Sequence, residues 1–206
     1  GYDAILKNWS TLSQYHIVFL PCAWSQGTDC DTSSPAQDPT VQKNLKDFVA
    51  QGGKLYVTDY SYDYIREIWP EYIDWMQQTQ DFGSACLSGS YDAPAVVEDP
   101  GMAEWLAAQG LSSFTLEANW TMVDQVNTVS TTDYADNPVD ITPKVWVSGQ
   151  TPSDGTRPTT LSFERSCGRV LFSDFHTEGS GGSGLLAQEK ALLYVLLEVG
   201  VCIGVP

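Results

Sequence analysis

A chain of 206 residues has the length of one domain and can bury a sizeable core, so we expect residues 1–206 to form a single domain. Its 26 acidic and 10 basic side chains give a net charge of −16, which repels the phosphate backbone of nucleic acids and anionic membrane surfaces. The longest apolar run, residues 191–201, is interrupted by Glu198, so we expect no membrane insertion.

The cysteines and histidines limit which metal sites and compartments fit the chain. Five cysteines without a C-x-x-C pair, together with only His16 and His176, cannot build a standard structural zinc site. We expect no cofactor, with weak Ca²⁺ binding in the acidic loop 29–38 as the alternative. The composition favours a secreted or extracellular protein, because lysines are few, Trp and Tyr are frequent and the cysteines are scattered. The cell surface and the periplasm are the alternative locations. Two sequons, at Asn8 and Asn119, are candidate glycosylation sites.

The first part of the chain alternates between helical and strand patterns. Residues 4–13 predict a short helix, and the apolar run 16–20, stopped by a proline, predicts an inner strand buried on both faces. Residues 39–51 place apolar side chains at helical spacing and end at two glycines, and residues 54–58 predict a second strand. The order strand, helix, strand indicates a parallel βαβ unit.

The middle of the chain is less regular. Residues 63–77 predict a helix kinked or split by a proline, and residues 101–109 predict another helix. Residues 81–100 show little pattern, and residues 127–143 are expected to be surface loop. Short strands are expected at residues 114–116, 122–126 and 144–147.

A β-hairpin and an apolar helix are predicted at the C-terminal end. Residues 159–163 and 169–175 flank the turn sequence 164–168 of the hairpin. A glycine-rich loop then leads into a helix over residues 185–199. The hairpin and this helix complete the expected α/β fold.

The cysteines suggest one disulfide more strongly than the others. Cys167 precedes the last strand and Cys202 follows the last helix, which returns along the sheet, so both are expected at the same end of the fold. A bridge between them is the favoured pairing. The pairing of Cys22, Cys30 and Cys86 stays open.

Three separated segments each join an apolar strand to a short distinctive ending. They are Tyr-His-Ile-Val-Phe-Leu-Pro-Cys-Ala (15–23), Gly-Lys-Leu-Tyr-Val-Thr-Asp-Tyr-Ser (53–61) and Val-Leu-Phe-Ser-Asp-Phe-His-Thr-Glu (170–178). In this order they resemble the class I glutamine amidotransferase-like superfamily, including its trehalose-utilisation (ThuA-like) relatives. The resemblance implies a flavodoxin-like three-layer α/β/α sandwich with a mostly parallel sheet, here with a C-terminal β-hairpin. It also implies a chain cut from a longer protein, because the family's first strand would precede residue 4.

The same resemblance implies where a site would lie. The family's first segment ends in Pro-Gly-Gly, whose amides form an oxyanion hole, and Cys22 and Ala23 stand in place of the glycines. Its second segment is a sharp nucleophile elbow, Gly-x-Cys-x-Gly, in which Asp59 falls on the cysteine. Its third segment ends in Phe-His-Pro-Glu, and His176 and Glu178 match the base and its orienting acid. The candidate catalytic residues are therefore Asp59, His176 and Glu178.

The departures from the family pattern change the expected chemistry. Asp59 cannot supply the thiolate that amide hydrolysis by this class requires, so we expect no glutamine amidotransferase activity. Because the elbow glycines are also replaced, an ordinary turn is expected at Asp59. Its carboxylate could act as a general base, pair with protonated His176, or share a cation with Glu178.

Residues beside these positions are candidates for ligand binding. They are Cys22, Ala23, Trp24, Tyr60 and Tyr62. The tyrosines could equally be core residues, and Cys22 could be reactive, buried or bridged. Seven Trp and ten Tyr residues suggest a carbohydrate site, with Trp24 and Trp69 at its rim, whereas Trp105 and Trp146 have the apolar neighbours of core residues.

Two functions from different classes remain open. The favoured one is a ligand-binding or assembly domain of a larger extracellular bacterial protein, with other domains or subunits as partners and a small molecule, glycan or Ca²⁺ at the rim of Asp59, His176 and Glu178. The alternative is a hydrolase acting on a glycan, ester or amide with His176 as base, with or without a metal-bound water. The missing Ser or Cys at the elbow disfavours the hydrolase.

Overall fold

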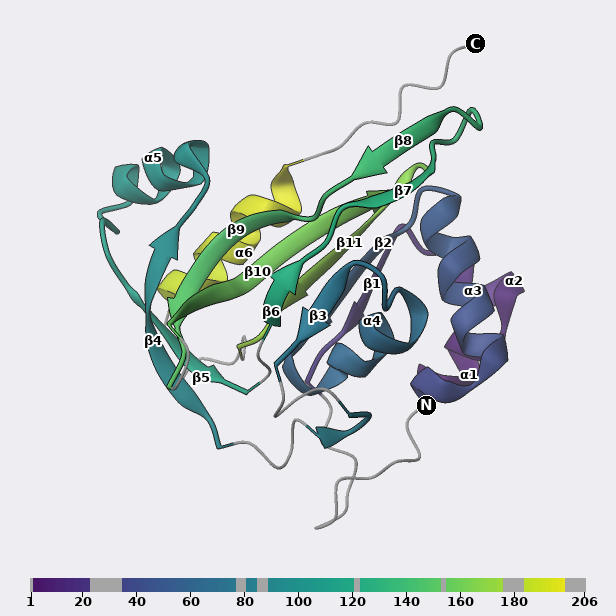
Figure 1. Cartoon of the computed structure of the whole chain (residues 1–206), viewed down its shortest axis with the longest axis horizontal. Helices are drawn as coiled ribbons and strands as arrows, with labels where there is room; N and C mark the ends of the chain where they lie inside the picture. Colours follow the sequence, from purple (N-terminus) through teal and green to yellow (C-terminus); the bar gives the residue numbers. More distant parts are fainter. Residues whose placement is uncertain are drawn as a thin grey trace.

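The computed structural model describes residues 2–22, 35–76, 81–84, 89–120, 123–152, 155–175 and 184–198 of the protein. Within these ranges, seven strands form one sheet in the order β1-β2-β11-β10-β9-β4-β5 (Figure 1). The strands are β1 (Ile17–Leu20), β2 (Lys54–Thr58), β4 (Tyr91–Val97), β5 (Thr115–Asn119), β9 (Lys144–Gln150), β10 (Thr156–Arg165) and β11 (Gly168–Ser173). The chain therefore has the expected α/β architecture.

Strand direction divides the sheet into two parts. β1 and β2 are parallel, as are β2 and β11, whereas the four other pairings of this sheet are antiparallel. The prediction of a mostly parallel sheet is therefore wrong. β9, β10 and β11 follow one another through short connections, and short connections permit only antiparallel pairing. The predicted βαβ unit is formed by β1 and β2, which are joined through a longer connection that contains a helix.

β1 occupies the edge of the sheet. The prediction of an inner strand buried on both faces is wrong, because Ile17 and Phe19 are 39% and 52% exposed. The ring of Phe19 meets the edge of Tyr56 on β2, with 5.5 Å between ring centroids. An apolar run thus marks a strand but does not say how many neighbours it has.

Helices cover both faces of the sheet (Figure 1). They are α1 (Tyr2–Lys7), α2 (Trp9–Leu12), α3 (Pro39–Ala50), α4 (Asp63–Ile68), α5 (Pro100–Ala108) and α6 (Ala187–Leu197), with short 3-10 turns η1 (Pro35–Gln37) and η2 (Asp59–Tyr62). One core joins α1 to α4 with the sheet, and a second joins α5 and α6 with its other face. This arrangement agrees with the predicted three layers, in which the sheet lies between two layers of helices. The more specific prediction of a flavodoxin-like fold stays a prediction. No helix in the described ranges is long and apolar enough to span a membrane.

Local side-chain chemistry explains several helix boundaries. The helix expected over residues 4–13 is broken at Asn8, whose side chain accepts the Thr11 N–H and caps α2. Asp38 caps α3 in the same way through the Thr40 N–H, at 2.8 Å. Helix α3, strand β2 and helix α5 confirm the segments predicted at 39–51, 54–58 and 101–109.

Two small sheets correct other expectations. β3 (Ile73–Trp75) pairs with β6 (Val123–Val126), so the helix predicted to residue 77 ends at Ile68 and gives way to a strand. β7 (Val129–Thr132) pairs with β8 (Pro138–Ile141), so the expected surface loop 127–143 is a hairpin. Its turn is closed by the Asp133 carboxylate, which accepts the N–H groups of Ala135 and Asn137.

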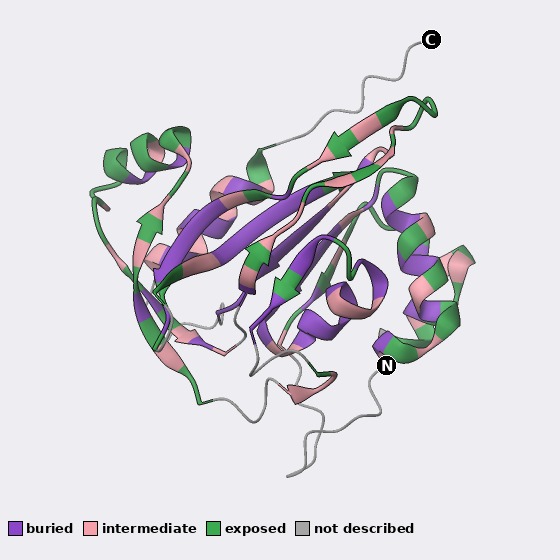
Figure 2. Ribbon diagram, in the orientation of Figure 1, coloured by how far each residue is buried: buried purple, intermediate pink, exposed green. Residues whose placement is uncertain are grey.

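The predicted C-terminal hairpin is confirmed and lies in the middle of the sheet. β10 and β11 pair from Thr160↔Ser173 to Arg165↔Gly168. β11 is buried over most of its length and β10 over residues 159–163, whereas the β7–β8 hairpin alternates exposed and partly buried residues (Figure 2). A Cβ on Gly168 would lie 1.9 Å from the carbonyl oxygen of Val49 at the end of α3, so only glycine fits there. Cys167 lies in the hairpin turn, while Cys202 falls outside the described residues.

Candidate functional site

Two buried carboxyl groups lie side by side at the carboxyl ends of β2 and β11. Thr58 and Ser173 are paired in parallel register, so Asp59 and Asp174 are the next residues on neighbouring strands. Their side chains are 0% and 1% exposed. This edge of an α/β sheet is where ligands commonly bind. We call Asp59 and Asp174, with Tyr60, Tyr91 and Trp120 around them, the rim.

The backbone at Asp59 makes a sharp turn between strand and helix. Its φ is +48°, in the left-handed region, and η2 and α4 follow directly. The expectation of an ordinary turn is therefore wrong, and the strand ends in a sharp elbow. A left-handed aspartate costs about 1 kcal/mol, and Asp tolerates this conformation better than most residues.

Hydrogen bonds from the end of β1 support this elbow. The Thr58 hydroxyl accepts the Cys22 N–H at 2.9 Å, and the Ser61 hydroxyl donates to the Pro21 carbonyl at 2.7 Å. The residues on either side of Asp59 are thus tied to the segment that follows β1. Cys22 lies close to the candidate site as the sequence predicted.

Burial and charge both act on Asp174. Burial raises its pKa well above the ordinary value, and the nearby charge of Asp59 raises it further. The Tyr91 hydroxyl donates to Asp174 Oδ2 at 3.4 Å, a long contact. In the described part of the chain, Asp174 Oδ1 has no hydrogen-bond partner.

Backbone contacts hold Asp174 in place from two other strands. Its N–H donates to the Thr159 carbonyl on β10, and its carbonyl accepts the Trp120 N–H beyond β5, both at 3.0 Å. Asn119, the last residue of β5, is fully buried and its amide nitrogen donates to the carbonyls of Tyr91 and Leu116. The sequon at Asn119 is therefore not an accessible glycosylation site.

Two aromatic rings border the carboxyl pair. Tyr60 and Trp120 are both partly buried and pack with 5.1 Å between ring centroids. Burial raises the pKa of Tyr60 to about 12, with smaller contributions from the charges of Asp59 and Cys22. The ring pair and the carboxyl pair together offer apolar and polar contacts within one region.

Several other aromatic candidates belong to the core. Tyr62 is fully buried and its ring packs against Trp75, so it is a core residue, which is the alternative that the sequence left open for it. Trp69 is 2% exposed and packs on Phe163, so its predicted place at a sugar-binding rim is wrong. Trp146 is buried at 1%, as expected of a core residue.

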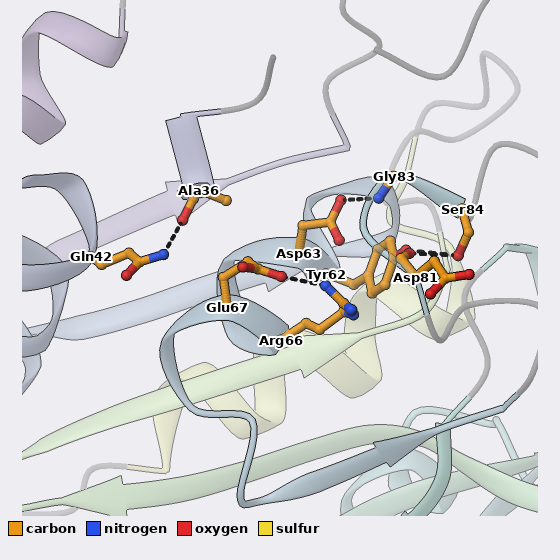
Figure 3. A network of polar contacts seen from close by, with 9 residues as sticks. All are labelled: Ala36, Gln42, Tyr62, Asp63, Arg66, Glu67, Asp81, Gly83 and Ser84. Carbon is orange, nitrogen blue, oxygen red and sulfur yellow. Dashed lines mark hydrogen bonds and ion pairs between the residues drawn. The ribbon is translucent and has the colours of Figure 1, made fainter. Parts of the chain in front are cut away.

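A polar network holds the turn at residues 81–84 against η2 and α4 (Figure 3). The Tyr62 hydroxyl donates to the Asp81 carbonyl at 2.7 Å, and Asp63 Oδ2 accepts the Gly83 N–H at 2.9 Å. Burial raises the pKa of Asp63 to about 7, against a smaller lowering by the Gly83 hydrogen bond and by the charge of Arg66. We call Tyr62, Asp63 and residues 81–84 the clasp.

The structure tests the sequence-based site only in part. Asp59, Tyr60 and Cys22 come together, whereas Ala23, Trp24, His176 and Glu178 lie outside the described residues. Sequence reasoning missed Asp174, Tyr91 and Trp120 as members of the same region. Asp174 carried a usable signal, since it is an acidic residue next to the end of the strand predicted at 169–175. Tyr91 and Trp120 carried none, because β4 had not been recognised.

The described residues offer no ready-made metal centre. Among them, no group of three or more His, Cys, Asp or Glu side chains is placed to hold an ion. Ca²⁺ binding stays a prediction. What the rim can do with its own groups is donate and accept hydrogen bonds and exchange protons.

Comparisons with known proteins give similarity in fold only. No family model matches the chain, and no curated protein matches it. Among solved structures, the cytoplasmic protein STM3548 from Salmonella typhimurium is 12% identical with a TM-score of 0.53, and the match covers 94% of this chain and 77% of that one.

Two further structures match more weakly. A thua-like protein from Bacteroides uniformis is 12% identical with a TM-score of 0.49, over 95% of this chain and 73% of that one. The GH42 β-galactosidase Gan42B from G. stearothermophilus is 13% identical with a TM-score of 0.46, over 90% of this chain but only 21% of its own length. This chain thus spans about a fifth of the β-galactosidase.

Proposed function

We propose that the protein is a ligand-binding domain without amidotransferase activity, and that its ligand docks at the rim, with His176 and Glu178 as further contacts. The observation that carries this proposal is the left-handed, fully buried Asp59 beside a second buried carboxyl. Backbone strain and buried like charges both destabilise a fold, and they persist where a site needs them.

The chemistry of the rim favours a neutral hydroxylated ligand, such as a glycan unit. Carboxyl oxygens bind sugar hydroxyls, and the rings of Tyr60 and Trp120 supply the kind of amphipathic surface on which a sugar ring stacks.

Ligand-observed NMR with neutral mono- and disaccharides, and separately with Ca²⁺, tests this function. We expect binding of at least one saccharide by the native protein and a loss of about tenfold or more in Asp59→Asn, since a hydrogen bond to a charged acceptor contributes about 1.5–3 kcal/mol. Asp63→Asn is the matched control, because it changes a second buried aspartate four residues away. Equal affinity in Asp59→Asn, or no binding by any saccharide, would contradict the proposal.

A hydrolase is the second candidate, and one observation favours it. The pKa of Asp174 is raised beside the carboxyl group of Asp59. In many hydrolases, a carboxyl group with a raised pKa acts as the general acid, and a second group in the same site acts as the base. His176 is the proposed base. A screen with chromogenic glycosides and esters should then show turnover that His176→Ala abolishes, whereas a pure binding domain shows none.

We also propose that the domain is secreted and works beside other domains or subunits of a larger extracellular bacterial protein. A disulfide between Cys167 and Cys202 is part of this proposal, because such bridges persist outside the reducing cytosol. Peptide mapping under non-reducing conditions should recover the two cysteines in one linked fragment. Reduction should lower the free energy of unfolding by about 3–4 kcal/mol for a loop of this length. Two separately alkylated thiols would contradict the pairing.

A further inference from the structure

The two edges of the seven-stranded sheet differ in how they are protected (Figure 1). At the β5 edge, the Gln188 side chain accepts the Glu117 N–H at 2.6 Å, and Ala118 has a left-handed φ of +55°. Charged side chains, kinks and covering groups are common means by which a sheet edge avoids pairing with another strand. The β5 edge is therefore protected against a further strand.

The β1 edge lacks these protections in the described part of the chain. Strand β1 (Ile17–Leu20) has four apolar side chains and pairs with β2 without a bulge. The His16 carbonyl accepts the Lys54 N–H from β2 at 2.9 Å. Because the main-chain groups of successive strand residues point to opposite sides, those of Ile17 and Phe19 point away from β2. No hydrogen bond from a described residue reaches them.

The side chains of the same two residues are also uncovered. Ile17 is 39% and Phe19 is 52% exposed. Strand alternation places both on one face of the sheet, where the Phe19 ring contacts Tyr56. The edge thus offers apolar side chains and unbonded main-chain groups at the same two positions.

We propose that the β1 edge pairs with the β1 edge of a second copy of this chain, in antiparallel register about Val18. In this register Ile17 of each copy lies opposite Phe19 of the other, and each such pair exchanges two N–H···O=C hydrogen bonds. Both pairs lie on one face of the joined sheet, and each packs an aliphatic side chain against an aromatic ring. Strand β1 is thus complementary to itself.

The residues at both ends of β1 keep this ladder short. The next pair would place Tyr15 opposite Pro21, which has no N–H to donate. The Tyr15 N–H already donates to the Leu12 carbonyl at 3.1 Å. So short a strand pair covers far less surface than the roughly 1,200 Å² of a stable interface. The copies therefore associate weakly and reversibly.

The distribution of charge permits a second copy at this edge. The net charge of −16 makes two copies repel each other at long range. Residues 15–22, however, contain no acidic side chain, and the charged side chain of β2 is the cation Lys54, which is paired with Ile17. Salt screens the repulsion between exposed charges. Added salt should therefore strengthen the dimer.

Sedimentation velocity of the full chain, from about 10 μM to about 1 mM, tests the dimer. We expect a dimer fraction that rises with protein concentration and with salt. Phe19→Lys places a charge on the edge, as natural edge strands do, and should raise the dissociation constant about tenfold or more. Val96→Lys is the matched control, because Val96 is 46% exposed but lies on β4, which has a neighbouring strand on each side. This variant should dimerise like the native protein.

Hydrogen exchange of the native protein locates the contact. The amides of Ile17 and Phe19 should exchange more slowly as the protein concentration rises, whereas those of Val18 and Leu20, which point towards β2, should not change. A monomer at every concentration would overturn the proposal and leave the edge to a strand of a longer chain. A dimer that salt dissociates, or that is as strong in Phe19→Lys, would overturn it as well.

Discussion

The rim and the clasp both contain buried aspartates close to the end of β2, yet their bonds differ. Asp63 of the clasp accepts a backbone N–H at 2.9 Å, from Gly83. Within the described ranges, the side chain of Asp174 in the rim has only the 3.4 Å contact to Tyr91, and it lies beside a second carboxyl group. Burial and a raised pKa therefore do not by themselves mark a functional residue. A carboxyl group bonded to its own backbone holds a turn, whereas one that faces another carboxyl group remains open to a ligand or a proton.

The largest expected effect is on stability at the clasp. The pKa of Asp63 rises from 3.8 to about 7 on folding, so its neutral form stabilises the folded chain fully below pH 3.8, and this contribution is lost as the pH rises through about 7. Asp63→Asn is neutral at every pH. It should raise the free energy of unfolding by about 2–4 kcal/mol at pH 8 and change it little at pH 3.

Urea unfolding of both proteins across this pH range measures the effect. Saccharide binding should be unchanged in Asp63→Asn, which separates the clasp from the rim. A variant less stable than the native protein at pH 8 would show that the Gly83 contact needs the charged form.

At the rim the expected loss is in affinity rather than stability. Asp174→Ala removes one carboxyl group of the rim, and we expect saccharide affinity to fall about tenfold, or about 1.4 kcal/mol. The free energy of unfolding at pH 7 should not decrease, because a repelled carboxyl group is removed along with one long contact. Calorimetric titration and urea unfolding of the same samples test both statements. If Asp174→Ala were less stable than the native protein and still bound saccharide with native affinity, Asp174 would be a structural residue and not a binding residue.

A smaller effect is expected from the second member of the clasp. Tyr62→Phe deletes the hydroxyl that donates to the Asp81 carbonyl, and a buried hydrogen bond contributes about 1 kcal/mol. The loss should appear locally as faster hydrogen exchange of the Gly83 and Ser84 amides. Unchanged exchange at these two amides would mean that the turn is held without Tyr62.

The smallest change in stability belongs to Tyr91→Phe. Its hydroxyl contact of 3.4 Å is longer than a normal hydrogen bond between oxygens, so unfolding should change by less than about 0.5 kcal/mol. Circular dichroism during thermal unfolding is sufficient to see this. A destabilisation comparable to that of Tyr62→Phe would place Tyr91 with the structural residues.

Much of the fold was accessible from the sequence. Apolar periodicity, the Asp38 cap and the two glycines after α3 define that helix and β2 closely. Strand direction was not accessible, because it depends on which strands become neighbours. The pairing of β4 with β9 joins segments about 50 residues apart, and residues 81–100 contain no alternation that reveals a half-buried strand.

The candidate site could also be predicted only in part from the sequence. Asp59 was found because it ends a recognisable strand, but its left-handed backbone was not, since it depends on the hydrogen bonds made by Thr58 and Ser61. Asp174 became a candidate only when parallel register placed it beside Asp59. Tyr91 reaches the same point from β4, a relation that no local pattern contains.

Backbone amide-shift mapping with the neutral saccharide panel tests the account most directly. We expect shifts concentrated at Asp59, Tyr60, Trp120 and Asp174, with the clasp amides at residues 81–84 unchanged. Shifts centred instead on the open pocket that includes Lys144 and Trp146, where the Lys144 ammonium lies 3.5 Å over the Trp146 ring, would contradict it. So would a panel that leaves every amide unchanged.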